Sequence, residues 1–268
     1  MLAALLFPVF ASARAAAQQT ACSSNFRQAG LAANLYFGDN NEGMVPAAYN
    51  GNLSANAHND RRWPQILGAY LPDRRIYKCP VDPMPWPRPP GVFDPDLVQV
   101  DAQSYEYGIA KLSNLGYNYL YLAPIVRFGN DRTSMPRSLG AIASTSGTIF
   151  GTDSVRAVTD SGKPIGGGSH LIVPPCRYQQ VGVSQIDSFY YGQGIEVIVE
   201  NLDWEKTDNN RFRKYGGAWP WHNGQMNVLF IDGHVKLMTP SNLVSGCTLE
   251  SQATGVIIDS GSYDWDLQ

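Results

Sequence analysis

Three side chains near the C-terminal end are of types that could do chemistry: His222, Asp232 and His234. Imidazole nitrogens and a carboxylate can bind a metal ion or transfer protons. However, Asp232 precedes Gly233, a dipeptide that favours a tight turn between two strands. No other carboxylate lies between the two histidines. We therefore expect His222, Asp232 and Gly233 to have a structural role, with hydrogen bonds from His222 and Asp232 fixing a hairpin.

The four cysteines are the second group with chemical potential. They are even in number and contain no C-x-x-C pair, which disfavours a zinc knuckle and favours two disulfides in an oxidising compartment. Three pairings are possible. We favour Cys22 with Cys79, which would join an N-terminal helix to the rest of the chain, and Cys176 with Cys247, which would tie the middle of the chain to its C-terminal strands. The alternative is four buried free thiols.

A short polar loop offers oxygen ligands. Asp39, Asn41 and Glu42 precede Gly43, and carboxylate and amide oxygens suit calcium. The loop lacks the glutamate that a complete EF-hand requires twelve residues from its start. Termination of a helix explains the same residues without an ion. We expect no resident cofactor, with calcium at this loop as the alternative.

Basic and aromatic side chains gather near position 215. They could stack on nucleic-acid bases or on sugars, but Arg and aromatic residues are also enriched where protein subunits contact one another. The net charge of −3 argues against capture of nucleic acid by bulk electrostatics. The chain has no G-x-S-x-G, P-loop or H-E-x-x-H motif, so we expect no enzyme activity and a subunit contact here. The residues are Arg211, Phe212, Arg213, Lys214, Tyr215, Trp219 and Trp221.

The first element that must position these groups is an N-terminal helix. Residues 1–11 carry no charged or polar side chain, and Arg14 is the first charge. Pro8 would kink the helix, and residues 38–43 favour turns that end it. A helix over residues 2–37 would be about 54 Å long, so its tip should protrude. One face repeats apolar residues at steps of three or four and should pack on the chain itself: Cys22, Phe26, Ala29, Ala33 and Phe37.

The remaining apolar side chains of this helix need another partner. The apolar run is shorter than the roughly 20 residues of a conventional membrane span. The competing interpretation is a secretory signal peptide cut after Ala13, but no positive segment precedes the run and the helix pattern continues through the cut. We expect assembly contacts between identical chains through Leu2, Leu5, Leu6, Phe7, Pro8, Phe10, Leu31 and Leu35.

The pattern of the remaining chain predicts an α+β fold, in which one long helix protrudes from and packs on an antiparallel sheet, with large loop-rich insertions. We assign residues 1–24 to an apolar assembly helix and residues 25–268 to a globular head. A short helix is expected over residues 62–71, an extended loop over 79–95, and exposed loops over 160–168 and 208–217. A type I′ turn at Asp232-Gly233 should join the last strong pair of strands. The expected strands are 104–110, 117–123, 147–150, 171–173, 195–200, 225–231, 234–238 and, more weakly, 255–258.

Three elements in order make the chain similar to a known superfamily. They are the cysteine and SSNFRQAGLA of the N-terminal helix, YKCPVDP around Cys79, and WHNGQMNVLFIDGHV, in which His222 stands ten positions before Asp232. The chain resembles type IV pilins and pseudopilins, and most closely bacterial prepilin-like proteins with a C-terminal H-x9-DG motif. The family's basic leader, processing site and N-terminal glutamate have no counterpart before Pro8. Leader processing and N-methylation are therefore assigned to no residue.

The resemblance implies a structural subunit that polymerises into a pilus-like or pseudopilus-like extracellular filament through its N-terminal helix. It further implies residence in the inner membrane before assembly, contact with a pilus or secretion machinery, a place on the bacterial surface, and no specific nucleic-acid partner. One alternative is a minor pseudopilin of a type II secretion-like machine. Another is a secreted enzyme or carbohydrate-binding protein with a signal peptide.

Overall fold

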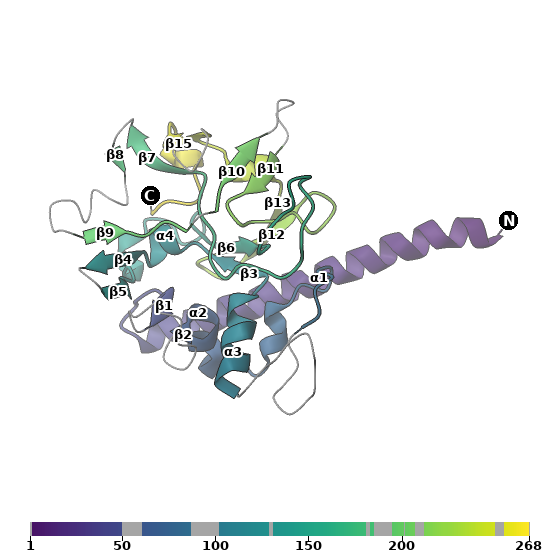
Figure 1. Ribbon diagram of the computed structural model, residues 1–268, viewed down its shortest axis with the longest axis horizontal. Coiled ribbons are helices and arrows are strands. Elements are labelled where there is room, and N and C mark those ends of the chain that lie inside the picture. Colours follow the sequence, from purple (N-terminus) through teal and green to yellow (C-terminus); the bar gives the residue numbers. More distant parts are fainter. Residues whose placement is uncertain are drawn as a thin grey trace.

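A computed structural model describes residues 2–49, 61–86, 102–128, 131–180, 183–184, 195–200, 202–206, 212–249 and 255–267. The fold is α+β, as predicted: one long N-terminal helix and a head built from small sheets (Figure 1). The N-terminal half of the helix extends away from the head, while its C-terminal half lies along it (Figure 1).

The long helix α1 (Leu2–Asp39) includes Pro8 near its start. Its 38 residues correspond to about 57 Å. The helix ends where Asn41 and Glu42 adopt positive φ values of 53° and 59°, and the amide of Glu42 donates to the carbonyl of Phe37 at 2.8 Å. Left-handed residues that reverse the chain in this way satisfy the last carbonyls of a helix.

The predicted docked face of α1 is confirmed. We use this term for Cys22, Phe26, Ala29, Ala33 and Phe37, all of which are at most 2% exposed. Helix α1 packs on two neighbouring strands of a four-stranded antiparallel sheet, β12 and β13, and on two short helical turns, η1 (Leu67–Tyr70) and η2 (Arg74–Tyr77). This sheet has the order β13 (Val235–Met238), β12 (Met226–Phe230), β6 (Ile149–Asp153), β3 (Leu115–Tyr117).

The sheet under the helix is antiparallel, as predicted. A second four-stranded sheet is mixed, because β15 pairs in parallel with β7. The sheet runs β14 (Cys247–Thr248), β15 (Gly255–Ile257), β7 (Cys176–Gln180), β8 (Val183–Ser184). A three-stranded sheet runs β5 (Asp131–Ser134), β4 (Ile125–Phe128), β9 (Ile195–Val197), and two hairpins pair β1 (Ala48–Tyr49) with β2 (Arg61–Arg62) and β10 (Trp204–Lys206) with β11 (Phe212–Tyr215).

Short helices connect these strands, and two of them replace predicted strands. Residues 104–110 lie in helix α3 (Ala102–Lys111), since Tyr105 and Ile109 turn to one face at helical spacing. Within 117–123 only Tyr117 is strand, and the rest forms α4 (Tyr119–Leu122), because a fully buried apolar run has no periodicity that separates the two structures. The remaining short helices are α2 (Trp63–Ile66), η1 (Leu67–Tyr70), η2 (Arg74–Tyr77), η3 (Leu139–Ala141), α5 (Pro240–Leu243) and η5 (Ser260–Ser262).

Of the remaining predicted strands and loops, most are confirmed and some are not. Residues 171–173 form no strand beyond one bridge from Leu171 to Tyr117, although all three are buried. Strands are confirmed within 147–150, 195–200, 225–231, 234–238 and 255–258. The predicted loop over 208–217 contains β11, and its residues 208–211, like residues 87–95 of the proline-rich loop, lie outside the described residues.

The turn between β12 and β13 docks directly on α1. A side chain added at Gly30 would lie 2.9 Å from the Leu229 side chain and 3.1 Å from the Cα of Gly233. Asn34 reinforces this approach by donating to the carbonyl of Ile231 at 3.2 Å. Gly30 is therefore required for the close approach of the helix, and Gly233 for its φ of 91°.

Gly30→Val should destabilise the head by about 1–3 kcal/mol, because the added methyl groups overpack a filled contact. Gly38→Val is the matched control on the same helix, since a side chain there would meet nothing within 4 Å. Urea unfolding of both variants measures the difference. Equal stability of the two would contradict the close approach of α1 to this turn.

Candidate functional site

The tip of α1 exposes a continuous run of large apolar side chains. Leu6, Phe7, Val9 and Phe10 are 63–74% exposed, and no described residue between positions 6 and 21 is buried. Leu2 and Leu5 continue the run in sequence, but the side chains of residues 2–5 lie outside the described part. Exposed apolar clusters of this kind mark sites of interaction with other molecules.

A second exposed apolar pair lies further along the same helix. Leu31 and Leu35 are 65% and 59% exposed, on the side of α1 that does not contact the head. Their spacing of four residues places them next to one another. No helix in the described part of the chain combines the length and the apolarity required to cross a membrane.

Pro8 lies within the exposed run, inside the helix. It lacks the amide that would bond to the preceding turn. Ser12 donates a hydrogen bond of 2.5 Å to the carbonyl of Pro8, so this side chain contributes a local contact at the same turn.

The predicted assembly residues that the structure describes share one property. All of them are exposed on α1, and none packs in the core of the head.

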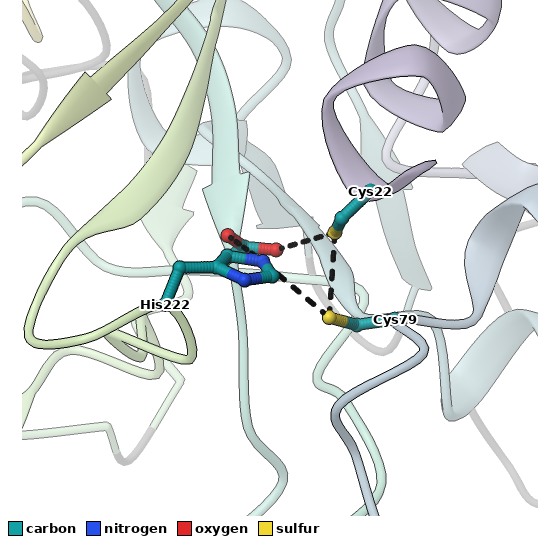
Figure 2. Close-up of side chains that lie close together, drawn as sticks. Cys22, Cys79 and His222 are labelled. Atoms are coloured by element: carbon teal, nitrogen blue, oxygen red, sulfur yellow. Dashed lines mark hydrogen bonds and ion pairs between the residues drawn. The ribbon is translucent and has the colours of Figure 1, made fainter. Parts of the chain in front are cut away.

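A different group of side chains converges inside the head, where α1 first becomes buried. Cys22, Cys79, Asp153 and His222 are all at most 4% exposed, and one potential metal-ligating atom from each lies within 4.8 Å of the others. The Sγ atoms of the cysteines are 3.3 Å apart. Figure 2 shows the two sulfurs, the imidazole and the carboxylate pointing toward one another. We call these residues the four-residue cluster.

Each member of the cluster comes from a different element. Cys22 lies on the docked face of α1, Cys79 follows η2, and Asp153 is the last residue of β6. His222 begins a two-residue turn through Asn223 and Gly224, which have φ values of 51° and 82° and are closed by backbone hydrogen bonds of 2.9 Å. Two positive φ values define a type I′ turn, so this Asn-Gly dipeptide aims the imidazole at the cluster.

In the cluster, each sulfur lies close to one oxygen or nitrogen atom that could bind a metal ion. The Cys22 Sγ lies 3.3 Å from Asp153 Oδ1, and the Cys79 Sγ lies 3.6 Å from His222 Nε2. His222 Nε2 is also 3.5 Å from Asp153 Oδ2. Asp153 is fixed from its far side by Asn227, whose backbone and side-chain amides donate to Oδ2 at 2.6 and 2.9 Å.

The short distances and the burial shift the acidities of the cluster. A hydrogen bond from the Cys22 thiol lowers the pKa of Cys79 and raises the pKa of Cys22. Burial raises the pKa of Asp153 to about 7, and the nearby Cys79 sulfur adds to this effect. Burial opposes a charge on His222, but the hydrogen bond to Cys79 and the charge of Asp153 together raise its pKa.

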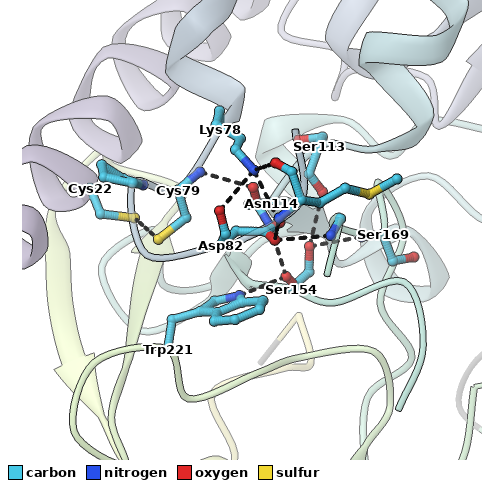
Figure 3. Close-up of polar contacts among 12 residues, drawn as sticks. Cys22, Lys78, Cys79, Asp82, Ser113, Asn114, Ser154, Ser169 and Trp221 are labelled. Carbon is cyan, nitrogen blue, oxygen red and sulfur yellow. Dashed lines mark hydrogen bonds and ion pairs between the residues drawn. The ribbon is translucent and has the colours of Figure 1, made fainter. Parts of the chain in front are cut away.

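A polar network holds the Cys79 turn in place (Figure 3). Asn114 accepts a hydrogen bond from the amide of Cys79 at 2.9 Å and donates one to Asp82 at 2.7 Å. The Asp82 carboxylate, which is buried, pairs with Lys78 at 3.7 Å and accepts from the amide of Gly167 at 3.1 Å. The Cys-Pro-Val-Asp segment is thus anchored by its last residue, which leaves the Cys79 sulfur directed at α1.

The structure places the side chain of His222 apart from those of Asp232 and His234, which contact each other. His222 contacts Cys79 and Asp153, whereas the side chain of Asp232 contacts His234 at 2.6 Å. The prediction that His222 and Asp232 fix the hairpin together is therefore wrong for His222. The turn at Asp232 is also not type I′, because only Gly233 has positive φ. It is a three-residue loop with Gly233 in the position that a bulged hairpin requires.

One of the two predicted disulfides is present. Cys176 and Cys247 are bonded and join β7 to β14. Cys22 and Cys79 are adjacent, as the predicted pairing requires, but they are free thiols. Their sulfurs lie 3.3 Å apart, well beyond the roughly 2.0 Å of a disulfide. The predicted second disulfide is therefore not formed in this structure, in which each thiol also contacts a second group, Asp153 for Cys22 and His222 for Cys79.

The other candidate groups have ordinary structural contacts. In the loop for which calcium was the alternative, Asp39 accepts a hydrogen bond from Tyr70 at 3.0 Å, and Asn41 and Glu42 form the end of α1. Among the described residues, the four-residue cluster is the one group of His, Cys, Asp or Glu side chains close enough to share a metal ion.

Of the basic and aromatic residues near position 215, Lys214, Tyr215 and Trp219 line a cavity. Arg213 and Lys214 pair with Glu205 at 3.4 and 3.1 Å. The Tyr215 and Trp219 rings lie 5.3 Å apart, and both residues line a cavity of about 240 Å³. Arg211 lies outside the described residues. The partial neutralisation of the basic groups weakens the case for binding phosphates at this surface.

Comparison of the chain with protein-family models, curated proteins and solved structures found no match. Two features of the molecule itself therefore indicate its function: the exposed tip of α1 and the buried four-residue cluster.

Proposed function

We propose that the chain is a structural subunit of a pilus-like or pseudopilus-like filament, held together by the apolar tips of identical α1 helices. The observation that carries this proposal is the exposure of Leu6, Phe7, Val9 and Phe10 on a helix that extends beyond the head. A tip with no charge before Arg14 has its complement in other copies of itself, which offer the same apolar surface.

The energetics favour many contacts over a single pair. Burial of one Val, Leu or Phe side chain contributes about 1.5–3 kcal/mol, so the four described tip residues contribute about 6–12 kcal/mol when fully covered. Association costs about 4–15 kcal/mol in lost freedom of motion. For a single pair of tips, the free energy gained by apolar burial is therefore close to the free energy lost on association. A helical array, in which each tip contacts several neighbours and Leu31 and Leu35 add lateral contacts, shifts the balance toward assembly.

Localisation follows from the same surface and from the disulfide. Before assembly, the tip would rest in the inner membrane and be delivered by a pilus or secretion assembly machinery. The Cys176–Cys247 disulfide is typical of proteins outside the reducing cytosol, which supports a place at the cell surface. The proposed subunit has no catalytic role.

A secreted carbohydrate-binding protein is the second candidate, because Tyr215 and Trp219 line a cavity. The cavity volume of about 240 Å³ is below the range of about 300–1,000 Å³ that is usual for ligand sites. Mass spectrometry of the mature chain distinguishes the candidates. Loss of the first 13 residues would favour the secreted protein, and retention of the tip would favour the filament subunit.

Leu6→Asp should abolish filaments while leaving the head folded, because a charge would be buried in the apolar bundle. Ile258→Asp is the matched control: Ile258 is 69% exposed, like Leu6, but lies on the head. Electron microscopy scores filaments, and circular dichroism confirms folding. Filaments from the Leu6 variant, or their loss in both variants, would refute the assembly role of the tip.

A further inference from the structure

The four-residue cluster has the composition and the shape of a metal-binding site. Two thiols, an imidazole and a carboxylate are the ligands that zinc takes in proteins. Zinc bonds of about 2.0–2.3 Å in a tetrahedron place neighbouring ligand atoms about 3.3–3.8 Å apart. One ligand atom from each of the four residues lies within 4.8 Å of the other three. The Cys22 Sγ is 3.3 Å from both Cys79 Sγ and Asp153 Oδ1, and the Cys79 Sγ is 3.6 Å from His222 Nε2, so a small outward movement of the two sulfurs, to about 3.8 Å, would complete the tetrahedron.

The geometry points to a structural zinc site formed by Cys22 Sγ, Cys79 Sγ, Asp153 and His222 Nε2. Sulfur and nitrogen donors in a tetrahedral arrangement select zinc over calcium or magnesium, which prefer six or more oxygen ligands. Four protein ligands complete the coordination shell, and all four are buried. A closed shell of this kind leaves no position for water or substrate, so the site stabilises structure and does not catalyse a reaction.

Charge balance supports the assignment. Cys22 and Cys79 would bind the ion as thiolates and release their protons on binding, so two thiolates and one carboxylate would face the ion. A divalent cation would leave a net charge of −1. Asn227 donates two hydrogen bonds to Asp153 Oδ2, which leaves Oδ1, the oxygen beside Cys22, for the ion; hydrogen bonds of this kind orient a metal ligand. The side-chain oxygen of Asn114 accepts a hydrogen bond from the backbone amide of Cys79 and so holds that turn in place.

Two other interpretations of the cluster explain less. A Cys22–Cys79 disulfide would leave Asp153 and His222 converging on sulfurs with which they no longer share a proton or an ion. A catalytic Cys79–His222 pair would need access for a substrate, yet both side chains are almost completely buried. The zinc site uses all four residues.

The position of the site gives it a mechanical consequence. Cys22 is the first buried residue of α1 after the exposed tip. The other three ligands come from the Cys79 turn, β6 and the turn before β12. The ion would therefore clamp the helix to three separate segments of the head at the place where it emerges. This inference is independent of the filament proposal, since a monomer with the same head would contain the same site.

The test is to produce the full chain in medium supplemented with Zn²⁺ or with Co²⁺ and to measure the metal content of the purified protein. We expect one ion per chain, and for Co²⁺ the visible bands of tetrahedral coordination with a sulfur-to-cobalt charge-transfer band. A chain that carries no metal from either medium overturns the proposal whatever the state of its thiols. So does an octahedral cobalt spectrum without sulfur ligation.

Variants identify the ligands. His222→Ala should lose the ion, whereas His234→Ala should retain it, because His234 contacts Asp232 on the exposed hairpin. Asn227→Ala, which removes one donor to Asp153, should weaken zinc affinity about 10–100-fold in competition with a chelator. Equal metal content in both histidine variants would overturn the assignment. The cobalt spectrum of the unaltered chain decides the question if a variant does not fold.

Discussion

Phe26→Ala should lower the free energy of unfolding of the head by about 3–5 kcal/mol, the usual cost of removing a buried phenylalanine side chain. Phe26 is 2% exposed on the docked face of α1. Its loss would leave a cavity between the helix and the head, which can close only if the helix moves. Urea unfolding, followed by tryptophan fluorescence, measures the change.

Phe10→Ala is the matched control for this prediction. The same side chain is removed from the same helix, but Phe10 is 70% exposed, so the stability of the monomeric head should be unchanged. The effect should appear instead in filament yield. Reversal of this pattern, with Phe10 required for folding and Phe26 dispensable, would contradict the division of α1 into an assembly tip and a docked segment.

Removal of the Cys176–Cys247 disulfide should destabilise the head by about 4 kcal/mol. The two cysteines are 71 positions apart, and a cross-link that closes a loop of roughly this length restricts the unfolded chain by about that amount. Unfolding of the double variant Cys176→Ala/Cys247→Ala, compared with the unaltered chain, measures the loss. A difference below about 1 kcal/mol would show that the bond does not constrain the unfolded state as the chain-entropy account requires.

The double variant also tests the state of the other two cysteines. Because Cys22 and Cys79 are free thiols in the structure, a reductant should change the stability of the unaltered chain but not that of the double variant. A further loss of stability on reduction of the double variant would reveal a second disulfide between Cys22 and Cys79.

Local patterns predicted much of the fold. The helical spacing of Cys22, Phe26 and Phe37 identified the docked face, and the exposure of Leu31 and Leu35 matches their position on another side of the helix. The hairpin around Gly233 was located correctly. These features depend on residues that are near one another in sequence, where periodicity and turn preferences act directly.

These local patterns could not predict the four-residue cluster, because its members are far apart in sequence and are brought together only by tertiary packing. No local pattern links Asp153 to the two cysteines, although a carboxylate at the end of the buried strand Ile149–Asp153 is an unusual place for a charge. His222 was paired with Asp232 by their sequence spacing, whereas the structure pairs it with Cys79. The Asn223-Gly224 dipeptide is the sequence feature that predicts the position of His222, because Asn-Gly favours a type I′ turn and therefore places a turn directly after this histidine.

Two predicted strands are helices in the structure, one in a fully buried run and one in a run with alternating tyrosines. In Ala102–Lys111, Tyr105 and Tyr107 alternate as the side chains of a strand would, but the segment is a helix. The buried run Tyr119–Leu122 carries no periodic signal, and its helical turn is set by contacts from elsewhere in the head. Tertiary context overrides local preference in both cases.

The most direct test of the account is a cryo-electron microscopy map of the fibres that this chain forms when it is expressed with a pilus or secretion assembly machinery. The account predicts a filament whose centre is a bundle of α1 helices, with Leu6, Phe7 and Phe10 buried between copies and the heads outside. Fibres in which these side chains face solvent, or a chain that remains monomeric with its tip intact, would contradict it.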